Sequence, residues 1–277
     1  MTVGGPGTLY IVSTPIGNMG DFSFRAVEVL RQVGAVLAED TRHSRHLLDR
    51  YTIATPLVPY HEHNEAKATP RLIERLKAGE HLALISDAGT PLLSDPGARL
   101  VRAAVDAGLS VSPVPGASAL LAALVVSGVE LGRFTFYGFL PRKGGERRAS
   151  VAEIAQLRHA AVLYEAPARV GDTLAELATA GTADRVAVVA RELTKQYEEL
   201  RRGTVASLAA YYVDAPPRGE VVIVISGADA PSGASEEELR ARAAELRAAG
   251  HAPRDVAATL SSEMGAARNV AYRLAHE

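Results

Sequence analysis

Short apolar segments alternate with helix-forming segments throughout the first 127 residues of the chain. Strands are expected at residues 8–12, 35–38, 57–60, 82–85 and 110–114. Parallel strands need a crossover connection, which is usually a helix. The alternation therefore predicts that residues 1–127 form an α/β domain with a mostly parallel sheet and helices on its faces.

The rest of the chain predicts two further units. Expected strands near residues 134–140, 161–164, 185–190, 200–204 and 220–225 have both hairpin-like and crossover connections. Residues 128–228 are therefore predicted to form a second α/β domain with a mixed sheet. A linker rich in Ala, Gly, Pro and Ser is expected at 228–234, followed by a small helical C-terminal tail at 235–277.

Composition and missing motifs exclude several classes of protein. The chain has 277 residues, of which 47% are hydrophobic and none is Cys, so thiol catalysis and disulfides are excluded. The formal net charge is −2, which gives no global attraction to nucleic acid. No apolar segment is long enough to span a bilayer and residues 1–7 do not resemble a signal peptide, so we expect a cytoplasmic protein. Dinucleotide, Walker and nucleophile-elbow motifs are also missing, which disfavours redox, nucleotide hydrolysis and serine hydrolysis.

The loop that follows the strand at 82–85 is the strongest candidate for a ligand site. Residues 86–91 are small apart from one carboxylate, Asp87, and small residues let the backbone approach a ligand closely. Ligands of open α/β sheets bind beyond the carboxyl ends of the strands. We expect this loop to form the floor of a cofactor site, with a ligand-free turn as the alternative. Asp95 is expected to cap the next helix and Pro96 to occupy its first position.

Polar residues follow other expected strands as well. Residues 39–43 read Glu-Asp-Thr-Arg-His, and such a dense cluster after a buried strand favours a functional role over simple helix capping. Asp21 is expected to cap the helix that ends near Val33. His61 and His63 alternate as zinc ligands do, but no third ligand has matching spacing, so no metal site is predicted.

Five short motifs together resemble one enzyme family. They are Ser-Thr-Pro-Ile-Gly-Asn at 13–18, Glu-Asp-Thr-Arg at 39–42, Ser-Asp-Ala-Gly-Thr-Pro at 86–91, Pro-Gly at 115–116 and Arg-Glu-Leu-Thr-Lys at 191–195. Their order and separation resemble the tetrapyrrole-methylase superfamily of S-adenosylmethionine enzymes. Within it, the chain closely resembles the ribosomal small-subunit RNA methyltransferase I family, the 16S rRNA (cytidine-2'-O)-methyltransferases.

The resemblance implies a fold, a reaction and a cofactor site. The fold is α/β: a two-domain tetrapyrrole-methylase-like (class III methyltransferase) fold plus the helical tail, assembled as a homodimer. S-adenosylmethionine would methylate the ribose 2'-oxygen of a cytidine in the decoding region of 16S rRNA in the small ribosomal subunit. By matching position, the cofactor would contact Pro15, Gly17, Asp87, Ala88, Gly89, Ala117, Ser118, Glu165 and Glu220.

Three residues are candidates for the chemistry. A 2'-hydroxyl is a poor nucleophile while protonated, so a general base or a cation beside the developing alkoxide would help. Glu39, Asp40 and Lys195 are the candidates. Two alternatives stay open, because Asp40 and Arg42 would also form a structural pair and Lys195 would also serve as a phosphate clamp.

RNA contacts are expected from a Gly-rich basic loop at 141–148. The expected contact residues are Arg42, Arg142, Lys143, Arg147 and Arg148. The near-neutral net charge predicts that cations gather on one face and that the assembled subunit is the substrate. A tetrapyrrole methyltransferase of the corrin pathway and a non-catalytic RNA-binding assembly protein are the alternative functions; the basic loop and tail favour RNA, and the retained acidic residues favour catalysis.

Overall fold

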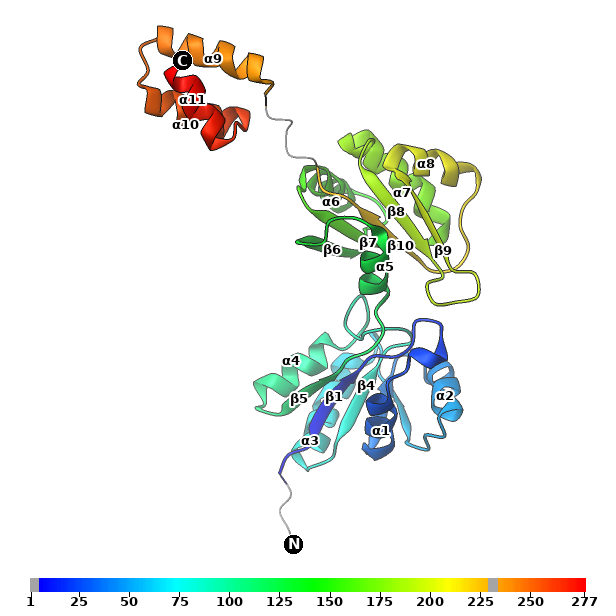
Figure 1. The fold of residues 1–277 in the computed structure, drawn as a ribbon. Coiled ribbons are helices and arrows are strands. Elements are labelled where there is room, and N and C mark those ends of the chain that lie inside the picture. The colour runs from blue at the N-terminus through cyan, green and yellow to red at the C-terminus, as the bar shows by residue number, and fades with distance from the viewer. Residues whose placement is uncertain (1–4, 229–233) are drawn as a thin grey trace.

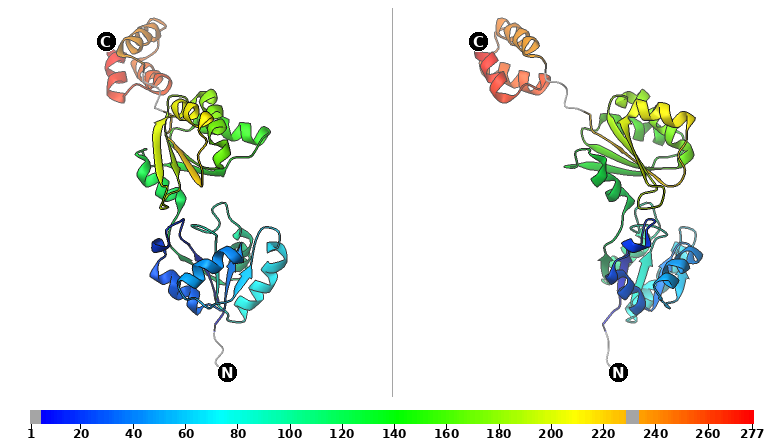
Figure 2. Two further views of the ribbon diagram at one scale, coloured as in Figure 1. Left: turned by 90° about the vertical axis from the view of Figure 1, so that its right-hand side faces the viewer. Right: turned by 45° about the vertical axis from the view of Figure 1, so that its right-hand side comes forward.

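The computed structural model describes residues 5–228 and 234–277, which form two α/β domains and a separate three-helix unit (Figure 1). Two further views show the same succession of three parts (Figure 2). The predicted linker at 228–234 and the predicted flexible N-terminus at 1–7 lie largely outside the described residues.

The first domain is a five-stranded parallel sheet with the strand order β3-β2-β4-β1-β5. The strands are β1 (Thr8–Val12), β2 (Ala35–Ala38), β3 (Leu57–Pro59), β4 (Leu82–Ile85) and β5 (Ser110–Val114). The helices are α1 (Phe24–Gln32), α2 (Thr41–Arg50), α3 (Glu65–Lys77) and α4 (Ala98–Asp106). Strand β4 is buried along its whole length, and separate apolar clusters cover the two faces of the sheet. The predicted parallel sheet is confirmed.

Two predicted helix caps are wrong. Ser23, rather than Asp21, caps α1, because its side chain accepts a hydrogen bond from the Ala26 amide. Asp95 does not cap α4, and Pro96 lies outside that helix, because Gly97 is the N-cap residue with φ of 133°. A Cβ atom on Gly97 would lie 2.5 Å from Leu84 Cδ2, so only glycine lets the chain cross this closely over β4.

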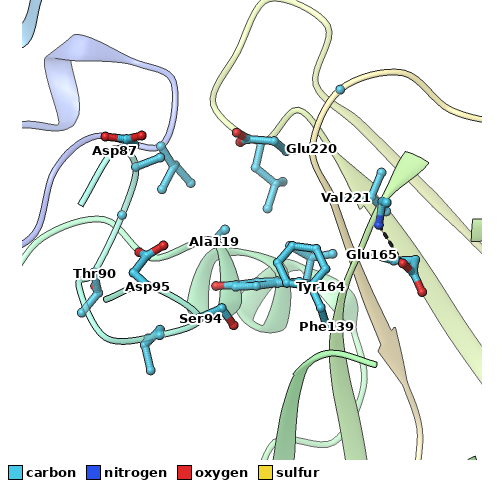
Figure 3. Close-up of a pocket in the computed structure, with 18 of the residues that line it drawn as sticks. Asp87, Thr90, Ser94, Asp95, Ala119, Phe139, Tyr164, Glu165, Glu220 and Val221 are labelled. Carbon is cyan, nitrogen blue, oxygen red and sulfur yellow. Dashed lines mark hydrogen bonds between the residues drawn. The ribbon is translucent and has the colours of Figure 1, made fainter. Parts of the chain in front are cut away.

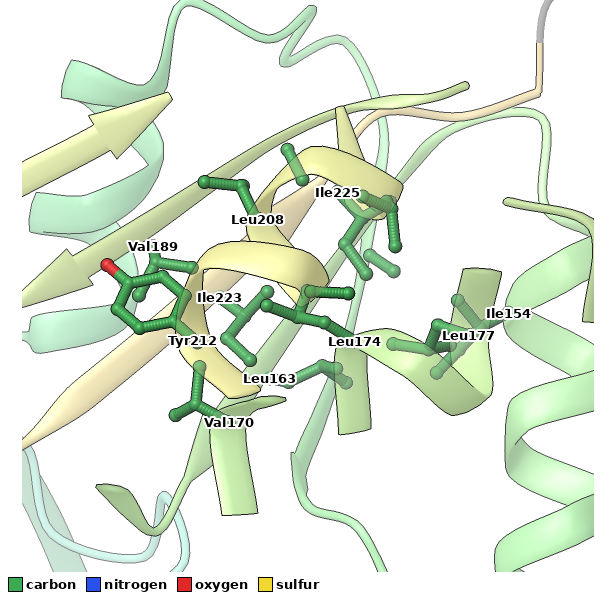
Figure 4. Packing of buried hydrophobic residues seen from close by; sticks show 14 of the residues in the cluster. Ile154, Leu163, Val170, Leu174, Leu177, Val189, Leu208, Tyr212, Ile223 and Ile225 are labelled. Carbon is green, nitrogen blue, oxygen red and sulfur yellow. The ribbon is translucent and has the colours of Figure 1, made fainter. Parts of the chain in front are cut away.

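The second domain is a mixed sheet with the strand order β6-β7-β10-β8-β9, in which only β6 and β7 are parallel. The strands are β6 (Phe134–Phe139), β7 (Ala160–Glu165), β8 (Val186–Arg191), β9 (Glu199–Thr204) and β10 (Val221–Ile225). The helices α6 (Gly145–Gln156), α7 (Val170–Leu177) and α8 (Val205–Asp214) cover one face. Their apolar residues form the core shown in Figure 4, which includes Leu174, Leu208 and Ile223.

Helix α5 (Ala119–Ser127) covers the other face of the second sheet. Its buried residues Leu120, Ala123 and Leu124 pack in one cluster with Val188 and Val224. Although α5 precedes the predicted boundary at residue 127, its buried side chains belong to the packing of the second sheet. The chain therefore passes from one domain to the other just before α5, beside the loop that follows β5.

The C-terminal tail consists of α9 (Glu236–Ala248), α10 (Pro253–Met264) and α11 (Arg268–His276). Leu239, Leu260 and Leu274 are part of an apolar core that these helices build from their own residues. A capping box between Ser235 and Glu238 starts α9. Across the described ranges, 5–228 and 234–277, no helix has both the length and the apolar character needed to cross a membrane.

Candidate active site

Two neighbouring cavities lie where the loops of the first sheet face the second domain. The larger of the two, shown in Figure 3, has a volume of about 490 Å³, and we call it the acidic cavity because Glu39, Asp87, Asp95 and Glu220 line it. The smaller has a volume of about 210 Å³, and we call it the α2 cavity because His43, Ser44, His46 and Leu47 of helix α2 line it. Both domains contribute to each cavity, so the site depends on how the domains pack together.

The loop after β4 joins the other loops at this edge of the sheet. The backbones of Thr14 and Gly89 exchange hydrogen bonds of 2.8 and 3.1 Å. The Thr90 hydroxyl donates to the Ala117 carbonyl at 3.1 Å. The loops after β1, β4 and β5 therefore form one unit around Asp87. The expected floor of the site is present, since Asp87, Ala88 and Gly89 all line the acidic cavity.

Among the described residues that line the acidic cavity, Glu39, Asp87 and Asp95 have no ion pair, whereas Glu220 is paired with Lys195. None of the described residues that line it is Lys or Arg. Burial, followed by repulsion from Glu39 and Asp87, raises the pKa of Asp95 to about 6. Burial and the same repulsion from Asp87 also raise the pKa of Glu39. A carboxylate that is partly buried among other carboxylates is suited to a cationic ligand, and such perturbed groups are frequent at functional sites.

Aromatic rings form the opposite wall of the acidic cavity. The rings of Phe139 and Tyr164 lie 5.7 Å apart between centroids, below the carboxylates of Asp87 and Glu220 in Figure 3. A planar group could pack against these rings while a positive charge faces the acids. Asp95 points into the same space, although the sequence analysis assigned it to a helix cap. Gly97 is the feature that could have revealed this, because a glycine cap leaves Asp95 free.

Backbone strain is concentrated in the two loops beside the acidic cavity. Five described residues other than glycine have positive φ. Leu92 and Ser94 lie in the loop after β4, and Glu192 and Thr194 lie in the loop after β8. Such conformations cost energy and persist at sites where the surroundings impose them. The strain therefore supports a functional role for this edge.

Asp40 has a structural role, which corrects its assignment as a candidate base. Its side chain accepts hydrogen bonds from the amides of Arg42 and His43 and from the Arg42 guanidinium, so it caps α2. These bonds lower the pKa of Asp40 to about 2, so its carboxylate is a weak proton acceptor. The alternative of a structural pair with Arg42 is confirmed. The amide of Asp40 also donates to Asp87 Oδ1 at 3.3 Å.

Lys195 connects the two domains. Its ammonium group donates to Glu192 Oε1 at 2.9 Å and to Glu220 Oε2 at 3.0 Å. Burial opposes the charge, but these two hydrogen bonds prevail and raise the pKa of Lys195. The raised pKa favours the charged form of Lys195, so a cation beside the alkoxide or a phosphate clamp fits it better than a general base. Its side chain also lies against Gly17, where a Cβ atom would come within 2.2 Å of Lys195 Cγ.

The carboxylate of Glu165 is turned away from the cavity (Figure 3). Glu165 is 2% exposed, and its oxygens accept hydrogen bonds from Arg169, Thr173 and the Ala166 amide. Its expected cofactor contact is therefore limited to its backbone, which lies beside Val221.

The remaining predicted cofactor residues lie around the two cavities. Pro15 and Gly17 line the α2 cavity rather than the acidic one. Ser118 caps α5 by accepting a hydrogen bond from the Leu121 amide. Ala117 accepts the bond from Thr90 described above, so Ala117 and Ser118 position Ala119, which lines the acidic cavity.

The basic segment 141–148 is only partly a loop, because α6 starts at Gly145. Arg147 is buried and donates to Glu176 at 2.6 Å and to Thr173 at 3.0 Å, which corrects its predicted contact with RNA. Arg142, Lys143 and Arg148 are exposed, as is Arg42. Within the part of the chain that the structure describes, no group of three or more His, Asp or Glu residues could hold a metal ion.

Known proteins resemble the chain in both sequence and fold. The sequence model of the tetrapyrrole (corrin/porphyrin) methylases matches residues 8–209. A ribosomal RNA small subunit methyltransferase I from Xylella fastidiosa (strain Temecula1) is 49% identical over 270 residues, which are 96% of this chain and 98% of that protein. The protein of the same name from Synechocystis is 45% identical and covers 98% of both chains.

Solved structures share the fold at low sequence identity. A uroporphyrin-III C-methyltransferase from Thermus thermophilus, complexed with S-adenyl homocysteine, aligns with a TM-score of 0.57 and 17% identity. The alignment covers 79% of this chain and 97% of that one, so the shared fold comprises both α/β domains. The extent and identity of the sequence matches confirm the resemblance: the chain belongs to the tetrapyrrole methylase family and, within it, to the ribosomal RNA small subunit methyltransferase I family.

Proposed function

We propose that this protein transfers a methyl group from S-adenosylmethionine to the ribose 2'-oxygen of a cytidine in the decoding region of 16S rRNA. The close relatives are named for methylation of small-subunit ribosomal RNA. The choice of cytidine and of the 2'-oxygen rests on the motif resemblance. The observation that carries the proposal is the acidic cavity, in which carboxylates and aromatic rings face each other with no Lys or Arg among the described lining residues.

The residues of the acidic cavity fit S-adenosylmethionine. Its sulfonium group is positive, and the unpaired carboxylates of Asp87 and Asp95 would compensate that charge. Its adenine is a planar ring that suits the wall formed by Phe139 and Tyr164. The raised pKa of Asp95 is consistent with this fit, because a bound cation would favour its charged form.

When bound, the cofactor supplies a methyl carbon that a 2'-oxygen attacks, while the electrons of the broken carbon–sulfur bond remain on a neutral thioether and the hydroxyl proton passes to an acceptor. Of the three catalytic candidates, Glu39 is the one that fits this acceptor. Its carboxyl lines the acidic cavity with a raised pKa, and a base works best when its pKa approaches the working pH. Orientation of the two reacting molecules can supply much of the remaining rate.

We also propose a homodimer that works in the cytoplasm on the assembled small subunit. Support for a second copy comes from α5, which is apolar on all sides although one side faces solvent. Leu121 and Val125, one helical turn apart, are 52% and 69% exposed. An apolar helix of this kind is normally buried, so a partner surface is expected over it. Size measurement in solution tests this arrangement.

The central test is a methyl-transfer assay. The protein is mixed with S-adenosylmethionine carrying a labelled methyl group and with small ribosomal subunits from cells that lack the enzyme. Label on a 2'-O-methylated cytidine is the expected result. Label on a tetrapyrrole substrate offered in parallel, with none in RNA, would replace this function with the corrin-pathway alternative. Cofactor binding without any transfer would favour a non-catalytic assembly protein.

A further inference from the structure

The α2 cavity is separate in chemistry from the acidic cavity but shares a wall with it. Ile16, Asp87, Ala88 and Glu220 line both cavities. The other lining residues of the α2 cavity include His43, Ser44, His46 and Lys195, whose side chains offer hydrogen-bond donors and no carboxylate. A group in the α2 cavity would therefore lie directly beside a group in the acidic cavity. This is the spatial relation that two reacting molecules require.

Ser44 is an incompletely satisfied polar residue in this wall. Its side chain is 2% exposed, it lines the α2 cavity, and its Oγ atom has no hydrogen-bond partner. Buried hydroxyl groups normally have a partner, because leaving one unpaired is costly. A serine within a helix can bond to the carbonyl four residues earlier, but Ser44 Oγ does not make this bond either. The hydroxyl therefore has its hydrogen-bonding capacity unused in the wall of the cavity.

The histidines of α2 are presented at the same cavity. His43 and His46 are three residues apart, so they lie on one face of the helix, and both are exposed. Imidazole rings can stack on a nucleobase and can also hydrogen-bond to ribose and phosphate oxygens. The cap that Asp40 forms on the first turn fixes the direction of this helix. The three side chains therefore form a preorganised polar surface rather than a flexible loop.

We propose that the α2 cavity is the subsite for the target ribonucleotide of a single-stranded RNA segment, with Ser44, His43 and His46 as its binding residues. This inference rests on the proposed function, because the nucleotide must reach a methyl group held in the acidic cavity. The division follows charge: the acidic cavity suits the cationic cofactor and repels phosphate, whereas the α2 cavity carries no carboxylate beyond the shared wall. Its volume of about 210 Å³ is less than half the 490 Å³ of its neighbour, which favours the neighbour as the main cofactor site.

The test uses Ser44→Ala, His43→Ala and His46→Ala in the full-length protein. For each variant, the KM for small ribosomal subunits is measured by labelled methyl transfer, and the Kd for S-adenosylmethionine is measured by calorimetry. We expect the KM to rise by about tenfold for each variant while the cofactor Kd changes by less than about twofold. Arg50→Ala is the matched control, because Arg50 is on the last turn of the same helix and does not line the cavity. Its KM should stay within about twofold of the unmodified protein.

Ser44→Ala also separates binding from a structural role. Removal of an unpaired buried hydroxyl should leave the melting temperature unchanged or raised, so a higher KM could not come from unfolding. An unchanged KM in all three variants, with normal transfer by the unmodified protein, would overturn the subsite alone. A weaker cofactor Kd in these variants would also overturn it, by assigning the cavity to part of the cofactor. If the unmodified protein neither labels RNA nor binds a cytidine-containing oligoribonucleotide, the proposed function and the subsite both fail.

Discussion

The two walls of the cleft use the same residue type in opposite ways. On the wall from the first domain, Asp87 and Asp95 have no cation beside them. On the wall from the second domain, Glu165 is held by Arg169 and Glu220 by Lys195. The comparison shows that a carboxylate in a cleft indicates binding only after its partners are known. Substitutions in the two walls should therefore have different effects on folding and on binding.

The largest loss of stability is expected from Arg169→Met, which removes the cation that is paired with Glu165. Glu165 is 1% exposed in its side chain, and its charge would remain buried without its cation. We expect the free energy of unfolding to fall by about 3 kcal/mol in urea denaturation, since removing one partner of a buried pair leaves an uncompensated charge. Arg99→Met is the control, because its pair with Glu65 is exposed and should contribute less than about 1 kcal/mol. An equal fall in the free energy of unfolding of both variants would show that the buried Glu165 pair stabilises the protein no more than the exposed pair does.

Asp87→Asn should weaken cofactor binding, because it neutralises one of the unpaired carboxylates of the acidic cavity. The substitution keeps the shape and an acceptor for the Asp40 amide but removes the negative charge. We expect the affinity for S-adenosylmethionine in calorimetry to fall about 100-fold, which corresponds to about 2.7 kcal/mol. Asp49→Asn removes an exposed carboxylate from α2 and should leave affinity unchanged. A loss of less than about threefold for Asp87→Asn would count against electrostatic binding by this wall.

Asp95→Asn should have opposite effects on folding and binding. Because burial raises the pKa of Asp95 from 3.8 to about 6, this carboxyl supports folding when protonated, below pH 4, and opposes it as the pH rises through 6. The variant should therefore gain about 1 kcal/mol of unfolding free energy at pH 7, after allowance for solvent screening, and nothing at pH 4. Its cofactor affinity at pH 7 should fall about tenfold.

The pH dependence of cofactor binding provides the check on Asp95. In the unmodified protein, affinity should decline as the pH falls through 6, because protonation removes the charge that faces the cofactor. In Asp95→Asn this decline should be weaker. An identical decline in both proteins would assign the titration to another group, such as Glu39.

Lys195→Met should have the smallest effect on stability, and it tests whether the ion-paired carboxylate of Glu220 differs from the unpaired ones. The two ion pairs of Lys195 are partly exposed, so we expect a loss of about 1 kcal/mol in unfolding free energy. Because Lys195 stays protonated, the pH–rate profile between 6 and 9 should keep its shape although the rate falls severalfold. Loss of a basic limb from that profile would restore Lys195 as a proton acceptor.

The cavities lie at the strand ends where the sequence predicts the site, and that position could be predicted because it depends only on the ends of strands. Each of the five segments expected as strands in residues 1–127 is a parallel strand, and all such strands place their carboxyl ends at one edge. The loop at 86–91 and the residues after β2 were therefore certain to be neighbours once the sheet was recognised. The sequence motifs added the family, which the comparisons confirm.

The roles of individual charges were predicted less well, because their partners are distant in the sequence. Arg147 pairs with Glu176, 29 positions away, and this buried pair leaves its guanidinium unavailable for a contact with RNA. Lys195 pairs with Glu220, 25 positions away, because the loop after β8 lies beside the start of the neighbouring strand β10. Asp95 was expected to serve the helix that follows it, but the path over β4 requires Gly97 at the cap instead.

The two α/β domains, the helical tail, the edge of the sheet that carries the candidate site and the enzyme family could all be predicted from the chain. They follow from periodicity, strand order along the chain and short motifs, all of which are local information. Which carboxylates are unpaired and which are neutralised became known from the folded structure alone. That distinction depends on desolvation and on charges brought together by folding, and both vary with distances that no local pattern specifies.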